Sequence, residues 1–405
     1  MSTTYRTMVC RVRPKNRNEY KALWHQCVSS RAVYNMGMYT CRQHYFEHQT
    51  FLPYTKVYKK VRQTYPDYKT LHSQAAQQTL RKVHQDMISF FEGLKVAQKT
   101  KSGNQVRLPR YKDRNSLFNT YLSKDCFKVI GHRLRLSLSK ACQAYSGIRF
   151  LHVPLAPHTS TKQIKQIEII PHTNGQWFEL GVTYMEPSIK PKVKDSTRAV
   201  LGIDLGVNNL LSIIDTKRGK PILIDGRELK SLNQFHNKRY AAYQARAKRE
   251  NQRSMTKRLA LMHRKRRYQI KDRFHKIAVS IARYCEQEGI TDVVVGKNPG
   301  WKQRARLGRV NNQHFVQLPY ERLISYIRYR CEALQISFEL QEESHTSKCD
   351  ALACEEVAHQ TNYLGRRVKR GLFRSSLGVL LNADTNGAIN MIRKSKGKVF
   401  EPWVQ

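Results

Sequence analysis

Two short acidic motifs, far apart in the chain, contain the residues best suited to hold a divalent metal ion. Asp204 ends an apolar segment, and Gly206 follows two positions later, where the missing side chain lets backbone or a ligand approach closely. Asp384 stands where a helix is expected to begin, and small residues follow it. A carboxylate at a buried strand end costs several kcal/mol unless it is paired or bound to metal. We therefore predict metal binding for both residues, while a turn-forming Asp204 and a helix-capping Asp384 are the alternatives.

The charge of the chain indicates a polyanionic partner. Of 405 residues, 73 are Lys or Arg and 30 are Asp or Glu, which gives a net charge of +43. A compact chain of this charge repels itself unless a polyanion neutralises it. The apolar fraction of 40% is sufficient for folded cores, and no apolar run approaches the ~20 residues that cross a membrane. Together with the two Asp motifs, this composition predicts metal-dependent phosphodiester chemistry.

The cysteines and the N-terminus indicate the compartment. Nine cysteines, an odd number, are scattered along the chain, which favours reduced thiols over a disulfide framework. The first ten residues lack the apolar core of a signal peptide. We therefore expect a cytoplasmic protein without a membrane partner.

Basic residues concentrate in one long segment and recur in a shorter one. Between His236 and Lys276, fifteen Lys and Arg accompany only two acids, an imbalance typical of a helical face that contacts phosphates. The predicted nucleic-acid contacts are Lys257, Arg258, Arg264, Lys265, Arg266, Arg267, Arg273 and Lys276, together with Arg367, Lys369 and Arg370. Contacts of this kind position a nucleic acid without reading its sequence.

Hydrophobic periodicity predicts a mixed α/β protein. In the front half it predicts a strand over 5–12, helices over 18–46 and 73–95, and strands between 117 and 184, including a hairpin at Asn174-Gly175. A Pro- and Lys-rich stretch over 186–194 separates the halves. In the back half, predicted strands over 199–204, 210–215, 222–224, 292–295 and 336–340 alternate with helices over 231–249, 254–287 and 315–334, and a last helix starts at Asp384.

Several stretches resemble the TnpB/OrfB proteins of bacterial insertion sequences, which are relatives of type V CRISPR effector nucleases. They are 202–215 (GIDLGVNNLLSIID), 293–303, 311–323, 342–349, 366–376 and 382–394 (NADTNGAINMIRK). The resemblance implies an RNase H-like (RuvC) nuclease domain over 196–405, with a degenerate zinc-ribbon-like insertion at about 345–380. It also implies a β-barrel-like (wedge) domain over 1–14 and 105–190, with a helical recognition insertion over 15–104.

The same resemblance implies partners and a catalytic centre. A guide RNA from the element end would select double-stranded target DNA by base pairing. Asp, Glu and Asp carboxylates would hold two Mg²⁺ (or Mn²⁺) ions on the scissile phosphate. Asp204 and Asp384 match the two aspartates. The glutamate normally follows the strand over 293–295, where this chain has Gly296.

Gly296 leaves two interpretations open. In the first, Glu343, with Glu342 as its substitute, supplies the third carboxylate from the end of the neighbouring strand, because adjacent parallel strands lie only ~4.8 Å apart. In the second, both glutamates are solvated strand-end charges and the protein binds nucleic acid without cutting it. We expect the first, with Asp204, Glu343 and Asp384 as the catalytic metal ligands.

The insertion also departs from the family pattern. Relatives often carry two Cys-x-x-Cys knuckles there, whereas this chain has only Cys349 and Cys354, with His345 and His359 nearby. This spacing is poor for a four-ligand site, so structural Zn²⁺ is not expected. The predicted function is an RNA-guided, divalent-metal-dependent DNA endonuclease of a transposable element. The alternatives are a catalytically impaired RNA-guided DNA-binding protein and a DNA transposase that acts directly on the element ends.

Overall fold

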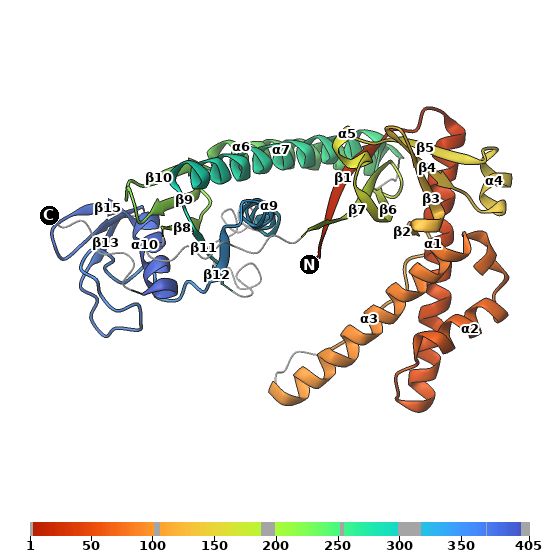
Figure 1. Ribbon diagram of the computed structural model, residues 1–405, viewed down its shortest axis with the longest axis horizontal. Coiled ribbons are helices and arrows are strands. Elements are labelled where there is room, and N and C mark those ends of the chain that lie inside the picture. Colours follow the sequence, from red (N-terminus) through yellow and green to blue (C-terminus); the bar gives the residue numbers. More distant parts are fainter. Residues whose placement is uncertain are drawn as a thin grey trace. The chain divides into compact units, whose positions relative to one another are not determined.

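The chain divides into two compact units. The computed structural model describes residues 3–100, 106–187, 199–251, 255–298, 317–369 and 371–397. Unit 1 is Met1–Ser188 and unit 2 is Ile189–Gln405, coloured red to yellow-green and green to blue in Figure 1. Each unit has its own sheets and its own hydrophobic core. Within the described ranges, no helix is both long and apolar enough to cross a lipid bilayer.

In unit 1, a helical segment lies between two strands of one sheet. The strands are β1 (Thr3–Val12), β2 (Thr120–Ser123), β6 (Gln163–His172) and β7 (Trp177–Pro187), in the order β1-β7-β6-β2. The helices between β1 and β2 are α1 (Arg17–His48), α2 (Tyr54–Thr64), the 3-10 helix η1 (Pro66–Thr70) and α3 (Ser73–Thr100). The predicted hairpin is confirmed: β6 and β7 pair with Ile169 opposite Leu180, and Thr173, Asn174 and Gly175 of its turn all have positive φ.

The β-barrel-like domain that the resemblance implies for unit 1 is not a closed barrel among the described residues. The strands β3 (Phe127–Ile130), β4 (Arg133–Ser137) and β5 (Phe150–Pro154) form a second sheet of their own, and no ladder among the described residues closes either sheet into a barrel. The short helices α4 (Lys140–Ser146) and α5 (Pro157–Ser160) connect and follow these strands. Strands β2 and β3 have only four residues each. Helical and strand residues such as Leu23, Leu80, Leu122 and Phe178 share one core.

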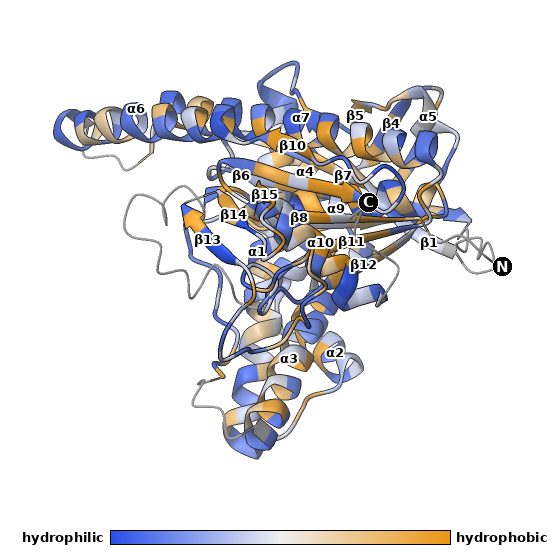
Figure 2. Ribbon diagram, turned by 90° about the vertical axis from the view of Figure 1, so that its left-hand side faces the viewer, coloured by the Kyte–Doolittle hydropathy of each residue, from blue (hydrophilic) through white to orange (hydrophobic). Residues whose placement is uncertain are grey.

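A five-stranded mixed sheet forms the centre of unit 2. Its strands are β8 (Val200–Leu205), β9 (Asn209–Asp215), β10 (Ile222–Asp225), β11 (Asp292–Gly296) and β12 (Ser337–Gln341), in the order β10-β9-β8-β11-β12. Strands β10, β9 and β8 are antiparallel, and β11 runs parallel to both β8 and β12. Strands β8 and β11 in the middle of the sheet are largely orange in Figure 2, as expected for strands that are covered on both faces.

Helices cover both faces of this sheet. They are α6 (Arg227–Asn251), α7 (Lys257–Glu288), α9 (Tyr320–Ala333) and α10 (Ala383–Lys396). One core joins the sheet to α7 and α9 and includes Phe274 and Ile327. A second, smaller core joins the opposite face to α10 and includes Ile389 and Ile392.

Alternation along β8 determines which side chains face α10. Leu201 and Ile203 belong to the core with α7 and α9, whereas Val200 belongs to the core with α10. A Cβ added to Gly202 would meet the carbonyl oxygen of Ala388 at 2.7 Å, so the backbone of α10 lies directly on the strand. The period of two then assigns Asp204 to the same face.

The segment between β12 and α10 is held together by buried hydrogen bonds. It contains the three-stranded sheet of β13 (Arg366–Lys369), β14 (Leu372–Arg374) and β15 (Leu380–Asn382). The buried carboxylate of Asp350 accepts bonds from the Ser375 hydroxyl and from the N–H and hydroxyl of Ser376, and also from the N–H groups of Leu352 and Ala353. Burial acts to raise the pKa of Asp350, but the Ser376 and Ser375 bonds lower it below its ordinary value.

Two asparagines of α10 anchor this segment to the helix. Asn386 donates to the carbonyl oxygen of Cys349 at 2.9 Å and accepts from the N–H of Ala351 at 3.0 Å. Asn390 donates to the carbonyl oxygens of Thr346 and Cys349 at 2.9 and 2.7 Å. Because all of these groups would otherwise be buried without partners, the two side chains fix the segment against α10.

Replacing Asp350 by Ala is expected to lower the free energy of unfolding by about 2–4 kcal/mol, because several buried donors lose their acceptor. Chemical denaturation at neutral pH measures the loss. The folded-state pKa of Asp350 lies below the unfolded one, so the difference from wild type is complete at neutral pH and shrinks as the pH falls below about 4. Glu356→Ala, an exposed acid of the same segment, is the control and should change stability by less than about 0.5 kcal/mol. Equal losses in both variants would contradict the role of Asp350.

Candidate active site

Asp204 and Asp384 meet where β8 ends against the first turn of α10. The N-cap of α10 is Asn382, whose side chain accepts from the N–H of Asp384 at 2.8 Å, so Asp384 is not the capping residue. Its Oδ2 accepts from the side chain of Asn209 at 2.9 Å. One helical turn later, a Cβ on Gly387 would lie 3.3 Å from Oδ2 of Asp204. The structure therefore brings together the two aspartates that the sequence singles out.

A glutamate fills the space that Gly296 leaves. In the parallel pairing of β11 with β12, Gly296 lies beside Gln341, and Glu343 follows two residues later. A Cβ on Gly296 would lie 2.6 Å from Oε1 of Glu343 and 2.2 Å from the sulfur of Met391. The Glu343 carboxylate thus occupies the volume into which a side chain at the end of β11 would project.

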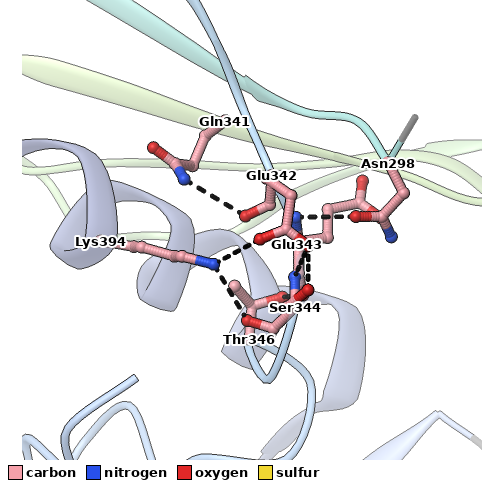
Figure 3. A network of polar contacts seen from close by, with 7 residues as sticks. All are labelled: Asn298, Gln341, Glu342, Glu343, Ser344, Thr346 and Lys394. Atoms are coloured by element: carbon pink, nitrogen blue, oxygen red, sulfur yellow. Dashed lines mark hydrogen bonds and ion pairs between the residues drawn. The ribbon is translucent and has the colours of Figure 1, made fainter. Parts of the chain in front are cut away.

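Asn298 fixes the orientation of Glu343. Its side-chain amide donates to Oε2 of Glu343 at 3.0 Å, and its Oδ1 accepts from the N–H of Glu343 at 3.0 Å (Figure 3). Oε1 of Glu343 is buried and has no hydrogen-bond partner among the described residues. Burial, followed by the charge of Glu342, raises the pKa of Glu343 to about 7. An unpartnered buried carboxylate oxygen of this kind is suited to accept a cation.

Glu342 makes different contacts. Its Oε2 lies 2.7 Å from Nζ of Lys394, and its Oε1 accepts from both the N–H and the hydroxyl of Ser344 (Figure 3). Hydrogen bonds from Lys394 and Ser344 lower the pKa of Glu342, and its side chain is 44% exposed. Of the two glutamates that the sequence leaves open, Glu343 is the one whose charge acts on Asp204.

The charges of the other two carboxylates act on Asp204. Burial raises the pKa of Asp204 well above its ordinary value, and the charges of Glu343 and Asp384 raise it further. The N–H of Leu205 and the guanidinium of Arg367 oppose this shift. Arg367, on β13, lies 4.0 Å from Oδ1 of Asp384. Like charges gathered in this way resist joint ionisation unless a cation joins them.

The side chains fit a metal ion whose remaining ligands are water or phosphate oxygens. Across the described ranges, no three or more His, Cys, Asp or Glu side chains are placed so that they could hold a metal ion by themselves. Mg²⁺, however, usually takes only one or two carboxylates and keeps water or phosphate oxygens as its other ligands. The unpartnered Oε1 of Glu343 and the carboxylate of Asp204 are suited to such a site.

The sequence did not identify the residues that support this site. Tyr320, buried at the start of α9, donates its hydroxyl to the carbonyl oxygen of Gly206 at 2.6 Å and thereby holds the turn after Asp204. Asn209 and Asn298 orient Asp384 and Glu343. The only available signal was that Tyr320 and the two asparagines lie in or next to stretches that resemble the family.

The cysteines of the insertion do not assemble a four-ligand site in the described part of the chain. The buried thiol of Cys349 donates to the carbonyl oxygen of Ala358 at 3.5 Å, and Cys354 is exposed. The rings of His345 and His359 have their centroids 5.7 Å apart. The expectation of no structural zinc stays a prediction, which elemental analysis of the purified protein would test.

Most of the predicted nucleic-acid contacts lie on exposed surface. Lys257, Arg258, Lys265, Arg273, Lys276, Arg367 and Lys369 are exposed, Arg264 and Arg267 are half-buried, and Arg370 lies outside the described residues. Exposed ion pairs join Arg273 to Glu228 and Lys276 to Asp272; such pairs contribute little and leave both cations accessible to phosphate.

Arg266 is placed differently. Its Nε donates to the side chain of Asn233 at 2.6 Å and its Nη2 to the carbonyl oxygen of Gln317 at 3.2 Å. Desolvation by burial lowers its pKa. Arg266 therefore links α7 to α6 and to the segment before α9, and its predicted contact with nucleic acid stays untested.

Two family models match parts of the chain. Residues 182–302 match OrfB_IS605, described as a probable transposase. Residues 320–391 match the Cas12f1-like TNB domain. No curated protein sequence matches the chain significantly.

Solved structures show a similar fold. The Cas12f1 chain in the cryo-EM structure of a Cas12f1–sgRNA–target DNA complex is 14% identical, with a TM-score of 0.60 over 93% of this chain and 83% of Cas12f1. A CRISPR-Cas12f ternary complex is 14% identical at a TM-score of 0.37, covering 92% of this chain and 80% of that one. The mini-RNA-guided endonuclease CRISPR-Cas_phi3 is 10% identical at 0.41, covering 99% and 93%. The first of these places the chain among mixed α/β proteins with a Cas12f-like fold.

Proposed function

We propose that this chain, a TnpB-like protein by its matches to the OrfB_IS605 and Cas12f1-like models, is an RNA-guided, divalent-metal-dependent DNA endonuclease of a transposable element. The single observation that carries the proposal is that Asp204, near the end of β8, Glu343, after the end of β12, and Asp384, at the start of α10, converge. The order of that sheet, three antiparallel strands followed by two parallel ones, supports an RNase H-like (RuvC) nuclease unit.

In this proposal, Asp204, Glu343 and Asp384 hold Mg²⁺ (or Mn²⁺). When bound, the ions activate the attacking water and neutralise charge on the scissile phosphate. Asn298 and Asn209 keep the Glu343 and Asp384 oxygens in place, and outer contacts of this kind tune affinity by about 10- to 100-fold. Arg367 lies beside the carboxylates and is placed to contact the phosphate chain of the DNA strand.

The partners follow from charge and from the relative of known structure. Cas12f1 has been observed with sgRNA and target DNA, and a net charge of +43 favours polyanionic partners. We propose a guide RNA and double-stranded target DNA as partners. Base pairing with the guide then selects the sequence, so the protein's own contacts need only position phosphates.

Purification of the full chain with the RNA that it carries tests the proposal. The RNA is sequenced, and a DNA duplex that matches one of its ends, flanked by a randomised segment, is offered with Mg²⁺. We expect a cut product that requires Mg²⁺ and disappears after RNase treatment. Cutting that persists after RNase would instead support a transposase acting directly on DNA. Duplex binding without cutting, in either Mg²⁺ or Mn²⁺, would support the catalytically impaired binder.

A further inference from the structure

Helix α6 carries a ladder of alternating aromatic and arginine side chains, which we call the α6 ladder: Phe235, Arg239, Tyr243 and, from α7, Arg258. The first three are spaced by four residues and so share one face of the helix. The Arg239 guanidinium lies 5.3 Å from the ring centroid of Phe235 and 5.6 Å from that of Tyr243. The Arg258 guanidinium lies 3.9 Å from the Tyr243 ring.

Hydrogen bonds hold one end of the α6 ladder and leave the other open. Both Arg239 and Arg258 donate to the Tyr243 hydroxyl, which fixes the two guanidinium groups beside one ring. Phe235, at the opposite end, is 61% exposed. A ligand that stacks on this ring would remove apolar surface from water, which favours binding.

A cavity of about 450 Å³ opens beside Phe235, between α6 and α7. Leu229 and Leu232 supply apolar surface, and Gln269 and Asp272 supply polar groups. The volume lies within the range of about 300–1,000 Å³ that small-molecule sites occupy.

The cavity wall carries mixed charge, since Glu228 and Asp272 pair with Arg273 and Lys276, whereas the helical segment beside it is strongly basic. Between His236 and Lys276, fifteen Lys and Arg accompany two acids. Apolar ligands and acidic peptides would each use only one part of this site, the cavity or the cations. An unpaired nucleotide uses both, because its base stacks on an aromatic ring while its phosphate contacts arginine.

We propose that the α6 ladder and its cavity bind an unpaired stretch of nucleic acid, with one base stacked on Phe235 and flanking phosphates on Arg239 and Arg258. The inference rests on the proposed function, because that function supplies the nucleic acid. The binding site itself consists of other residues than the three carboxylates. RNA and DNA share the chemistry that the site recognises, so the experiment distinguishes between these two sources.

Photocrosslinking of the purified protein–RNA complex at 254 nm, followed by digestion and mass spectrometry, tests the stacking contact directly. We expect a nucleotide adduct on Phe235. An adduct with the resident RNA identifies RNA as the ligand. An adduct that forms only after addition of a 12-nucleotide single-stranded DNA identifies DNA. No adduct on Phe235 in either arm would overturn the proposal.

Binding measured without Mg²⁺ provides the second readout and is independent of cleavage. Phe235→Ala should weaken binding of the single-stranded oligonucleotide about tenfold, with an unchanged salt slope, and Phe235→Trp should restore it. Arg239→Ala should instead reduce the salt slope by about one. Leu261→Ala, which removes a 52% exposed apolar side chain from α7, is the matched control and should bind like wild type. Equal weakening of duplex and single-stranded DNA by Phe235→Ala would overturn the proposal, whereas failure of the nuclease proposal would leave these results unchanged.

Discussion

Replacing Asp204 or Asp384 by Asn is expected to reduce cleavage of guide-matched duplex DNA at least about 1,000-fold, which corresponds to about 4 kcal/mol of transition-state stabilisation. Each change removes a negative oxygen from the site while keeping the volume of the side chain. The amount of co-purified RNA should not change, because neither residue lies in the basic segments. Cleavage under single-turnover conditions in Mg²⁺ measures the effect.

Stability separates this functional role from a structural one. Asp204 is half-buried, and burial followed by the charges of Glu343 and Asp384 raises its pKa, so a charge on Asp204 destabilises the metal-free fold. Asp204→Asn should therefore unfold at the same temperature as wild type or at a higher one. Asp225→Asn, an exposed acid on the edge strand β10 of the same sheet, is the matched control and should cleave normally. A variant at 204 that cleaves like wild type, or one that loses activity only because it unfolds, would contradict the metal-ligand role.

The second large effect distinguishes two neighbouring glutamates. Glu343→Gln should lower cleavage at least about 100-fold, because the unpartnered Oε1 loses its charge while the amide can still accept from Asn298. Glu342→Gln should stay within about threefold of wild type, since Lys394 and Ser344 already bind that carboxylate. Titration of Mg²⁺ and Mn²⁺ with both variants measures the difference. The opposite ranking, or equal loss in both, would exclude Glu343 as the third ligand.

Moving the glutamate to the position that the family uses should not restore activity. A side chain at 296 starts 2.2 Å from the sulfur of Met391, a distance that requires the buried Met391 to shift. Replacing Glu343 by Gly relieves only the overlap between a Cβ at 296 and Oε1 of Glu343, which would lie 2.6 Å apart. We expect the double variant Gly296→Glu/Glu343→Gly to be less stable than Glu343→Gly and equally inactive, because overpacking a core costs about 1–3 kcal/mol. Recovery of cleavage in the double variant would contradict this account.

The sequence predicted the parts of the site that depend on local pattern. The two Asp motifs predicted Asp204 at the end of a strand and Asp384 at the start of a helix, and both positions are observed, while their role as metal ligands stays a prediction. The choice between Glu342 and Glu343 required the register of β11 with β12, which no local pattern encodes. The identity of the α10 cap also required coordinates, since Asn382 and Asp384 are both suitable caps.

Features that depend on long-range pairing escaped prediction. The strands of unit 1 alternate as strands of a barrel would, but their division into two sheets is a property of partner choice. The buried bonds of Asp350, Asn386 and Asn390 escaped for a related reason. Polar residues in an irregular segment usually indicate solvent exposure. Their burial is stable only because residues distant in sequence supply hydrogen-bond partners.

Locating Mn²⁺ by anomalous scattering, in crystals of the protein–RNA complex grown with that ion, tests the central claim most directly. The account predicts a peak within about 2.5 Å of oxygens of both Asp204 and Glu343, with Asp384 contributing to the same peak or to an adjacent one. Peaks that touch Glu342 instead, or no peak at these carboxylates at saturating Mn²⁺, would contradict it.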